Sequence, residues 1–310
     1  MTNQTTHFGI LGLGKMGGNM ARRLASKGIS IALFDQDAAL TASLASEIKA
    51  VATTSLADMV AKLAKPRVLW MMLPAGDITE STLAQLQALL GQGCEGDTIV
   101  DGANSNYKDS VRRAAKVEAL GFNYMDAGVS GGVHGLANGY CLMVGGSAAA
   151  LAAVQPYLEA LAPSRNVGWL HAGPAGAGHF TKMVHNGIEY GMMAALAEGL
   201  SLIKAKKEFD IDLADVTELW RHGSVVRSWL LDLTADTLKA DQNLDAVKAH
   251  VPDSGEGRWT VNESIEQGVP TPVMTMALMS RFSSQGADDY ASKLLAKMRQ
   301  GFGGHAVTKS

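Results

Sequence analysis

The sequence predicts an α/β protein in which an N-terminal, Rossmann-type doubly wound sheet is followed by an all-α C-terminal domain. Through the first half of the chain, short apolar runs alternate with amphipathic segments, a pattern that indicates βαβ units and a parallel sheet. After Gly178 the strand signal fades, and helical patterns follow one another as far as Arg299. We therefore predict a sheet domain over residues 1–177 and a helical domain over residues 178–310.

Each element of the sheet domain has its own local signal. Apolar runs of strand length, bounded by turn-forming residues, predict strands at 7–11, 30–35, 67–73, 98–102, 122–126, 139–146 and 169–173. One helix is expected between the last two strands, and helical periodicity predicts others at 16–27, 38–47, 78–90 and 107–120. A longer helix is predicted from about Ala177 to Lys206, because this stretch follows a glycine and contains no proline.

Composition and charge exclude several kinds of protein. Hydrophobic residues make up 47% and charged residues 18% of the 310 residues, which is typical of a globular chain. The net charge is −3 and no Lys/Arg run exceeds two residues, so we expect no nucleic-acid-binding surface. The first residues do not resemble a signal peptide, and the most apolar run, Val68–Leu73, is too short to cross a bilayer. Cys94 and Cys141 have no CxxC or Cys/His partner, so a reduced, cytoplasmic protein without membrane contact is expected.

A glycine-rich segment follows the first predicted strand and opens the first predicted helix. Its G-x-G-x-x-G pattern consists of Gly12, Leu13, Gly14, Lys15, Met16 and Gly17. In this context the glycines allow a tight turn, close approach of a pyrophosphate and close helix–strand packing, while the helix N-terminus attracts the anion. Asp35 ends the second strand, where a carboxylate accepts hydrogen bonds from a ribose 2′-hydroxyl and repels a 2′-phosphate. Gln36 is not the arginine that would neutralise such a phosphate, so the segment predicts NAD and disfavours NADP.

Three loops should meet beyond the carboxyl ends of the strands, where ligands bind in open α/β sheets. The loop after the strand at 67–73 should line the nicotinamide side, the loop at 101–110 presents a neutral amide, and the loop at 127–132 offers successive N–H groups to a carboxylate. The residues expected to face ligands are Leu73, Pro74, Ala75, Asn104, Ser130, Gly131 and Gly132. Each loop alone is also typical of an ordinary turn, but the convergence of three favours a site.

The long predicted helix carries four polar side chains at i, i+3, i+4 and i+7, which lie on one helix face. They are Lys182, His185, Asn186 and Glu189. A lysine and a glutamate flanking two hydrogen-bonding residues can act as an acid–base pair with substrate anchors between them, and we expect Gly187 and Gly191 to leave space close by. A solvated Lys–Glu surface is the alternative for this helix taken alone.

Six runs spread over nearly the whole chain resemble the decarboxylating 6-phosphogluconate dehydrogenases. They are GLGKMG, VDGANSNYKDSVRR, AGVSGGVHG, GAGHFTKMVHNGIEYG, GEGRWT and RQGFGGH. The run KMVHNGIEYG is the most specific, whereas GLGKMG and SGG are shared with the wider β-hydroxyacid dehydrogenase superfamily. The chain resembles the short form of the family. This resemblance implies oxidative decarboxylation of 6-phosphogluconate to ribulose 5-phosphate and CO2, with reduction of NAD and without a metal.

The resemblance also implies roles for individual residues. Lys182, which must be neutral when it acts, removes the C3 hydroxyl proton as hydride leaves, and once protonated it polarises the ketone so that CO2 is lost. Glu189 then acts as the general acid that protonates the enediol. The residues that anchor the substrate carboxylate and hydroxyls are expected to be Asn104, Ser130, Gly131, Gly132, His185 and Asn186.

The same resemblance assigns the phosphate end and the tail. Tyr190 and Arg281 match positions that hold the phosphate, and Arg299 and His305 match a tail motif that reaches the substrate of a neighbouring subunit. We therefore expect a homodimer or homotetramer in which each tail completes a neighbour's sugar-phosphate site. Without the resemblance, a C-terminal Arg and His would indicate only a frayed helix end.

The phosphate end departs from the family pattern. Ser254 stands where long-form members have a phosphate-binding lysine, and Glu256 stands where a small hydroxyl residue is usual. Arg258 is either structural or a compensation for the missing lysine, and His134 has no assigned role.

Two alternative functions stay open. One is a β-hydroxyacid dehydrogenase of the 3-hydroxyisobutyrate type, which does not decarboxylate and tends to have K-x-x-N-N where this chain has 182–186 as KMVHN. The other is a non-catalytic NAD-binding sensor on the same fold. The presence of both Lys182 and Glu189 argues against a sensor, because a protein that only binds has no need of the pair.

Overall fold

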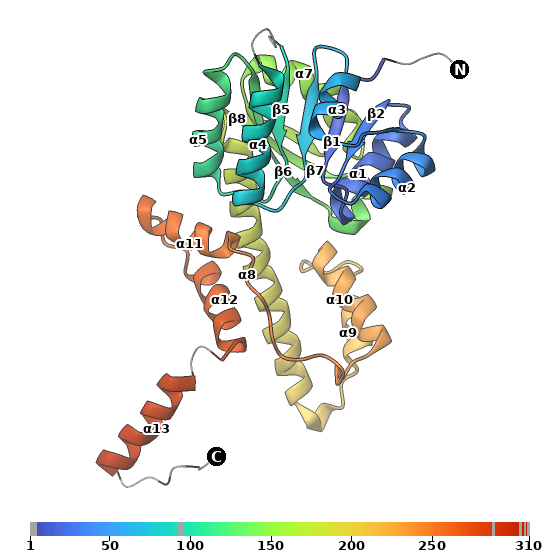
Figure 1. Ribbon diagram of the computed structural model, residues 1–310. Helices are drawn as coiled ribbons and strands as arrows, with labels where there is room; N and C mark the ends of the chain where they lie inside the picture. The colour runs from blue at the N-terminus through green and yellow to red at the C-terminus, as the bar shows by residue number, and fades with distance from the viewer. Residues whose placement is uncertain (1–4, 92–95, 287–288, 304–305, 307, 309–310) are drawn as a thin grey trace. The chain divides into compact units, whose positions relative to one another are not determined.

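The computed structural model describes residues 5–91, 96–286, 289–303, 306 and 308, and the chain divides into two compact units, Met1–Met183 and Val184–Ser310. In the first unit strands and helices alternate (Figure 1). The strands are β1 (Phe8–Leu11), β2 (Ile31–Phe34), β3 (Val51–Ala52), β4 (Val68–Met71), β5 (Thr98–Asp101), β6 (Asn123–Ser130), β7 (Cys141–Gly146) and β8 (Trp169–Gly173). The helices are α1 (Lys15–Ser26), α2 (Ala38–Ile48), α3 (Leu56–Lys62), α4 (Asp77–Leu90), α5 (Tyr107–Glu118), η1 (Gly132–His134), α6 (Gly135–Asn138) and α7 (Ala148–Leu161).

Within the described residues, the strands form one eight-stranded sheet in the order β3-β2-β1-β4-β5-β6-β7-β8. Pairing is parallel from β3 through β6, but β7 runs antiparallel to β6, and β8 is parallel to β7. The predicted parallel pairing is therefore found as far as β6, and the antiparallel pairing of β7 with β6 reverses the direction of the last two strands. A parallel crossover needs about a dozen residues or more, and the connection 131–140 holds only η1 and α6, so the chain returns beside β6 in the opposite direction.

Both faces of the sheet are buried, which confirms the doubly wound class. Along β4, Val68 and Trp70 belong to one hydrophobic core, which includes residues of α1 and α7. The alternate residues Leu69 and Met71 belong to a second core, which includes residues of α3, α4 and α5. Because successive side chains of a strand point to opposite faces, a strand buried on both sides reads as a continuous apolar run, as VLWM does here.

Two details of the sheet differ from the prediction. The short elements β3 and α3 have no predicted counterpart. The two residues of β3 are too few to give a periodic signal, and the seven residues of α3 make fewer than two helical turns. The strand β6 continues through Ala127 to Ser130, a stretch that the sequence suggests is a loop. Antiparallel pairing with β7 from Met125 to Ser130 explains the extension.

The helix α8 (Ala177–Ala205), predicted from about Ala177 to Lys206, continues from the first unit into the second. The second unit continues with η2 (Lys207–Phe209), α9 (Leu213–Trp220), α10 (Trp229–Ala240), α11 (Glu256–Gln267), α12 (Pro272–Ser284) and α13 (Asp289–Gly303). No strand occurs in the described part of this unit, which confirms the predicted all-α character. Of the helices that the structure describes, none combines the length and the apolar character needed to cross a membrane.

Candidate functional site

A cavity of about 1050 Å³ lies where β1, β2 and β4 end. The predicted residues among its walls are Gly12, Gly14, Lys15, Met16, Gly17, Asp35, Leu73 and Pro74. Leu13 is instead buried in the hydrophobic core, and Ala75 is an exposed residue of the loop after β4. The helix α4 forms a further wall through Ile78, Thr82 and Gln85. The glycine motif and the loop after β4 thus share one cavity.

The glycines of the motif have distinct steric surroundings. Gly12 has a φ of 90°, and a Cβ added to it would lie 2.3 Å from the carbonyl oxygen of Met72. A Cβ on Gly17 would lie 2.0 Å from the carbonyl oxygen of Gly12, so helix α1 and strand β1 pack at backbone contact. A Cβ on Gly14 would meet no described heavy atom within 4 Å, and no described side chain caps the α1 N-terminus at this residue. Open space and free N–H groups at a helix N-terminus fit a pyrophosphate.

The Asp35 carboxylate is held by backbone groups at the wall of this cavity. Its Oδ2 accepts a hydrogen bond of 2.7 Å from the Leu13 N–H, and its Oδ1 accepts one of 3.0 Å from the Asp37 N–H. The Leu13 bond ties the end of β2 to the glycine loop. The carboxylate therefore stands at a fixed position beside the pocket, where an adenosine ribose would lie if a dinucleotide followed the glycine loop.

The loops after β5 and β6 leave neighbouring strands of the sheet. Asn104 is exposed, while the adjacent residue Ser105 is buried. Ser130 is the last residue of β6, and Gly131 and Gly132 have φ values of 123° and 51°, which a residue with a side chain rarely adopts. The predicted carboxylate-binding loop thus begins only after Ser130.

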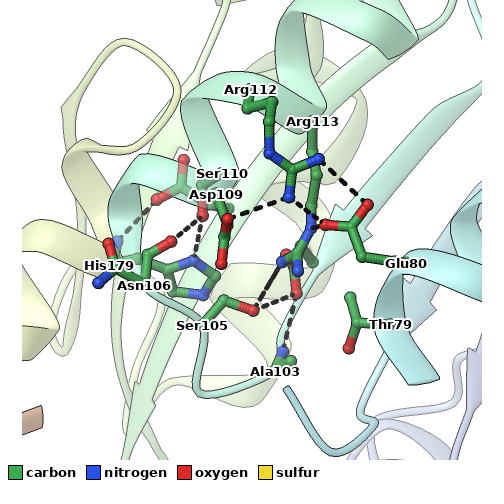
Figure 2. Close-up of polar contacts among 12 residues, drawn as sticks. Thr79, Glu80, Ala103, Ser105, Asn106, Asp109, Ser110, Arg112, Arg113 and His179 are labelled. Carbon is green, nitrogen blue, oxygen red and sulfur yellow. Dashed lines mark hydrogen bonds and ion pairs between the residues drawn. The ribbon is translucent and has the colours of Figure 1, made fainter. Parts of the chain in front are cut away.

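The start of α8 is anchored to β6 by a residue that sequence reasoning did not single out. The Asp126 side chain is fully buried, and its two oxygens accept hydrogen bonds of 2.6 Å from the N–H groups of Gly176 and His179. Burial raises the pKa of this carboxyl, while His179 and the backbone N–H groups oppose the rise. His179 is itself buried and its Nδ1 lies 2.7 Å from Ser110 Oγ (Figure 2). A carboxylate at the end of the predicted strand 122–126 is the signal that could have found it, although its partners lie 50 and 53 residues away in the sequence.

The four residues of the predicted stripe lie on α8, Lys182 at the end of the first unit and the others in the second. Lys182 is buried, with 9% of its surface exposed, and a Cβ on Gly128 of β6 would lie only 2.3 Å from its Cβ. His185 Nδ1 lies 2.9 Å from Asn186 Oδ1, and Glu189 is half-buried.

The expectation that Gly187 and Gly191 leave space for a ligand is wrong. A Cβ on Gly187 would lie 2.7 Å from Thr260 Cγ2, and one on Gly191 would lie 3.2 Å from Val273 Cγ1. These glycines instead allow α11 and α12 to pack closely on α8.

The predicted phosphate residues come together within the second unit. The Arg281 guanidinium lies 3.4 Å from the centroid of the Tyr190 ring, and the Tyr190 hydroxyl lies 3.3 Å from Ser254 Oγ. Arg258 forms an ion pair with Asp253, which also accepts a hydrogen bond from the Tyr190 hydroxyl. Burial works to raise the pKa of Asp253, but the hydrogen bond from Arg258 and that from the Gly255 N–H outweigh it and lower this pKa. Arg281 thus contacts Tyr190 directly, whereas Arg258 is connected to Tyr190 through Asp253.

Two further residues of the prediction are exposed. Arg299 is exposed on α13, and His134 is exposed in η1. His305 lies outside the described residues.

Comparison with known proteins identifies both units. Residues 7–170 match a family model described as the NAD binding domain of 6-phosphogluconate dehydrogenase, and residues 178–307 match the 6-phosphogluconate dehydrogenase C-terminal domain. A relative from Haloferax volcanii, named as an NAD(+)-dependent, decarboxylating 6-phosphogluconate dehydrogenase, is 39% identical over 97% of this chain and 98% of its own length.

Solved structures agree with this match. The Plasmodium falciparum 6-phosphogluconate dehydrogenase superposes with a TM-score of 0.81 and 29% identity over 98% of this chain, which spans 66% of that longer protein. A 3-hydroxyisobutyrate dehydrogenase from Salmonella typhimurium superposes with a TM-score of 0.73 at 24% identity over 91% of this chain and 95% of its own, a likeness that indicates the fold alone. The resemblance found in the motifs is confirmed: this chain belongs to the 6-phosphogluconate dehydrogenase family.

Proposed function

We propose that this chain catalyses the oxidative decarboxylation of 6-phosphogluconate to ribulose 5-phosphate and CO2, with reduction of NAD. The observation that carries the proposal is a lysine and a glutamate two helical turns apart on α8, of which the lysine is buried against a glycine of β6. Seven residues of α-helix span roughly 10 Å, which separates the two proton-transferring groups by several substrate atoms. The family match and the name of the Haloferax relative support the same reaction.

NAD, when bound, accepts the hydride that leaves C3 of the substrate. We assign to neutral Lys182 the removal of the C3 hydroxyl proton, because an amine accepts a proton only in its unprotonated form. The protonated Lys182 then donates a hydrogen bond to the new C3 ketone, so that the C1–C2 bonding electrons move towards that oxygen as CO2 leaves. Glu189 gives a proton to the carbon that has lost CO2, and the enediol becomes the product ketose.

The other α8 and loop residues would bind the substrate. Asn104, Ser130, Gly131 and Gly132 stand at the carboxyl ends of adjacent strands, where amide and N–H groups can hold a carboxylate and hydroxyls. His185 and Asn186 would contact hydroxyls between the two catalytic groups. Tyr190 and Arg281 would bind the phosphate: a guanidinium matches phosphate geometry, and stacking on the ring holds it in place.

We also propose that Asp35 makes the enzyme prefer NAD to NADP. Its carboxylate is fixed by the Leu13 N–H, so it cannot easily turn away from a 2′-phosphate, and like-charge repulsion would follow. We expect Asp35→Ser to lower the ratio of kcat/KM with NAD to kcat/KM with NADP by at least about tenfold. The reason is that the substitution removes a repulsion between the carboxylate and the 2′-phosphate that is worth about 1.4 kcal/mol or more. An unchanged ratio would remove Asp35 from this role.

We also propose that the chain acts in the cytoplasm and assembles with further copies of itself through the second unit. Tyr290, Leu294 and Leu295 of α13 are 77%, 47% and 59% exposed, which is unusual for large apolar side chains clustered on one helix. We propose a homodimer or homotetramer in which this helix and the tail with Arg299 and His305 contact a neighbour. Sedimentation of the full chain, and of a variant ending at residue 286, measures this directly. A monomeric full chain would contradict it.

The reaction itself is tested by following NADH and CO2 together with 6-phosphogluconate, in the wild type, Lys182→Met and Glu189→Gln. We expect equal amounts of NADH and CO2 from the wild type, and neither from Lys182→Met. NADH without CO2 would indicate a hydroxyacid dehydrogenase that does not decarboxylate, and NAD binding without turnover of sugar acids would indicate a sensor. Thermal unfolding of each variant controls for loss of the fold.

A further inference from the structure

We propose that Arg113 is a positioning residue that links helix α4, which lines the cofactor cavity, to the 102–106 loop that presents Asn104. Arg113 lies on α5 and its side chain is fully buried. It lies outside the cavity lining, so it acts only through the groups that it contacts. The inference rests on the proposed NAD-binding role of that cavity.

The first group that Arg113 contacts belongs to a helix of the cavity wall. Its Nε donates a hydrogen bond of 2.7 Å to Glu80 of α4 (Figure 2). Ile78 and Thr82, two positions before and after Glu80, line the cavity, so Arg113 contacts α4 on the helix face opposite the cavity. The fully buried Thr79 donates from its hydroxyl to the Pro74 carbonyl oxygen at 2.8 Å, which fixes the loop after β4 to the same helix. Arg113 therefore holds the helix that sets one wall of the cavity.

The second group belongs to the loop after β5. Arg113 Nη1 donates to Asp101 Oδ2 at 2.6 Å and to Ser105 Oγ at 2.8 Å. Asp101 in turn accepts hydrogen bonds from the Ala103 N–H at 3.1 Å and from the Tyr124 hydroxyl at 3.0 Å. The contacts at residues 101, 103 and 105 surround Asn104 in sequence, and Asn104 itself is exposed. One guanidinium thus fixes both the cavity wall and the Asn104 loop.

The preceding residue provides a natural comparison. Arg112 also donates to Glu80, at 2.5 Å, and to Asp109 at 3.0 Å, but its side chain is 43% exposed and contacts neither Asp101 nor Ser105 within the described hydrogen bonds. The hydrogen bond from Arg112, followed by that from Arg113, lowers the pKa of Glu80 to about 2, although burial opposes the shift. Both arginines hold Glu80 ionised, but only Arg113 connects it to the loop.

The test is a double-mutant cycle that leaves the buried Arg113–Asp101 ion pair intact. Glu80→Gln weakens the contact to α4, Ser105→Ala removes a contact to the loop, and Arg112→Gln removes only the surface contact. NAD affinity is measured by titration, KM and kcat by NADH formation with 6-phosphogluconate, and the fold by thermal unfolding. We expect Glu80→Gln and Ser105→Ala each to raise the Kd for NAD by about three- to thirtyfold, and Arg112→Gln by less than about twofold.

The double variant distinguishes the proposed link from two separate effects. If both contacts act through Arg113, the combined variant loses less affinity than the product of the two single losses. Independent, multiplying losses would overturn the link, and so would an effect of Arg112→Gln as large as that of Glu80→Gln. Wild-type affinity in both single variants would overturn it as well. A wild-type protein that does not bind NAD would instead refute the proposed function of the cavity.

Discussion

Replacing Gly128 by alanine should displace the proposed catalytic base while leaving the chemistry of every proposed site residue unchanged. The added methyl carbon would lie 2.3 Å from the Cβ and 2.9 Å from the Cγ of Lys182, and 3.1 Å from the carbonyl oxygen of Gly178. Ordinary contacts begin at 3.4 Å, so α8 must move away from β6 by about 1 Å. Backbone atoms and the root of the lysine side chain cannot rotate out of the way, so the helix itself has to shift.

The size of the effect follows from this displacement. Overpacking of this kind destabilises a protein by about 1–3 kcal/mol, which lowers Tm by about 2–4 °C for each kcal/mol. A misplacement of about 1 Å at a reacting group can reduce the rate about 100-fold. We therefore expect kcat with 6-phosphogluconate to fall by about two orders of magnitude, while the Kd for NAD changes by less than about twofold.

The assay compares Gly128→Ala of β6 with Gly199→Ala, a substitution within α8 itself. A Cβ on Gly199 would meet no described heavy atom within 4 Å, so this control should retain kcat and gain up to about 1 kcal/mol of stability from helix propensity. A folded Gly128→Ala protein with wild-type kcat would refute the reasoning, because it would show that the rate does not depend on the contact between β6 and the start of α8.

Three further predictions concern stability and substrate affinity. Asp126→Asn removes a charged acceptor of two 2.6 Å hydrogen bonds at the start of α8, so urea unfolding should show a loss of about 1–3 kcal/mol. The pKa of Glu80 is lowered from 4.5 to about 2, so the ionised Glu80 side chain stabilises the fold fully above pH 4.5 and loses this contribution as the pH falls towards 2. The difference in Tm between the wild type and Glu80→Gln should therefore become smaller as the pH is lowered over that range. Arg281→Ala should raise the KM for 6-phosphogluconate by about 10–100-fold, whereas Arg258→Ala should raise it by less than about fivefold, because Asp253 already neutralises that arginine. Steady-state kinetics at saturating NAD measures the KM of each variant, and equal increases in Arg281→Ala and Arg258→Ala would contradict the different roles of the two arginines.

Features that depend on neighbouring residues were predictable from the sequence. The turn at Gly12 follows from a strand–glycine–helix pattern, because only a residue without a side chain fits a φ of 90° beside the Met72 carbonyl. The strand at Trp169–Gly173 and the start of α8 at Ala177 also coincide with their predicted positions, since turn residues bound both. Local signals of this kind specify an element but not its partners.

Features that depend on distant partners were not predictable. Arg112 and Arg113 are the same residue type at adjacent positions of a polar helix, so residue type does not tell them apart. Only Arg113 lies on the buried helix face, together with Ser110, Ala114 and Val117. That helical spacing could have indicated its burial, but the partners of Arg113 lie 12 and 33 residues away in the sequence. Similarly, no local pattern distinguishes a parallel from an antiparallel β7, because strand direction depends on how far the connecting segment can reach.

The unpredicted direction of β7 matters for catalysis because this strand helps to seat the helix that carries Lys182. A Cβ on Gly145 of β7 would lie 2.5 Å from the Pro174 carbonyl oxygen and 2.8 Å from the Gly178 N, and Gly128 contacts the same helix from β6. The first turn of α8 therefore rests on backbone atoms of two antiparallel strands. At these contacts little can adjust when a side chain is added, because the neighbouring atoms belong to backbones or to the root of a side chain. The position of Lys182 should therefore be more sensitive to substitutions at Gly128 and Gly145 than to substitutions at the polar residues around them.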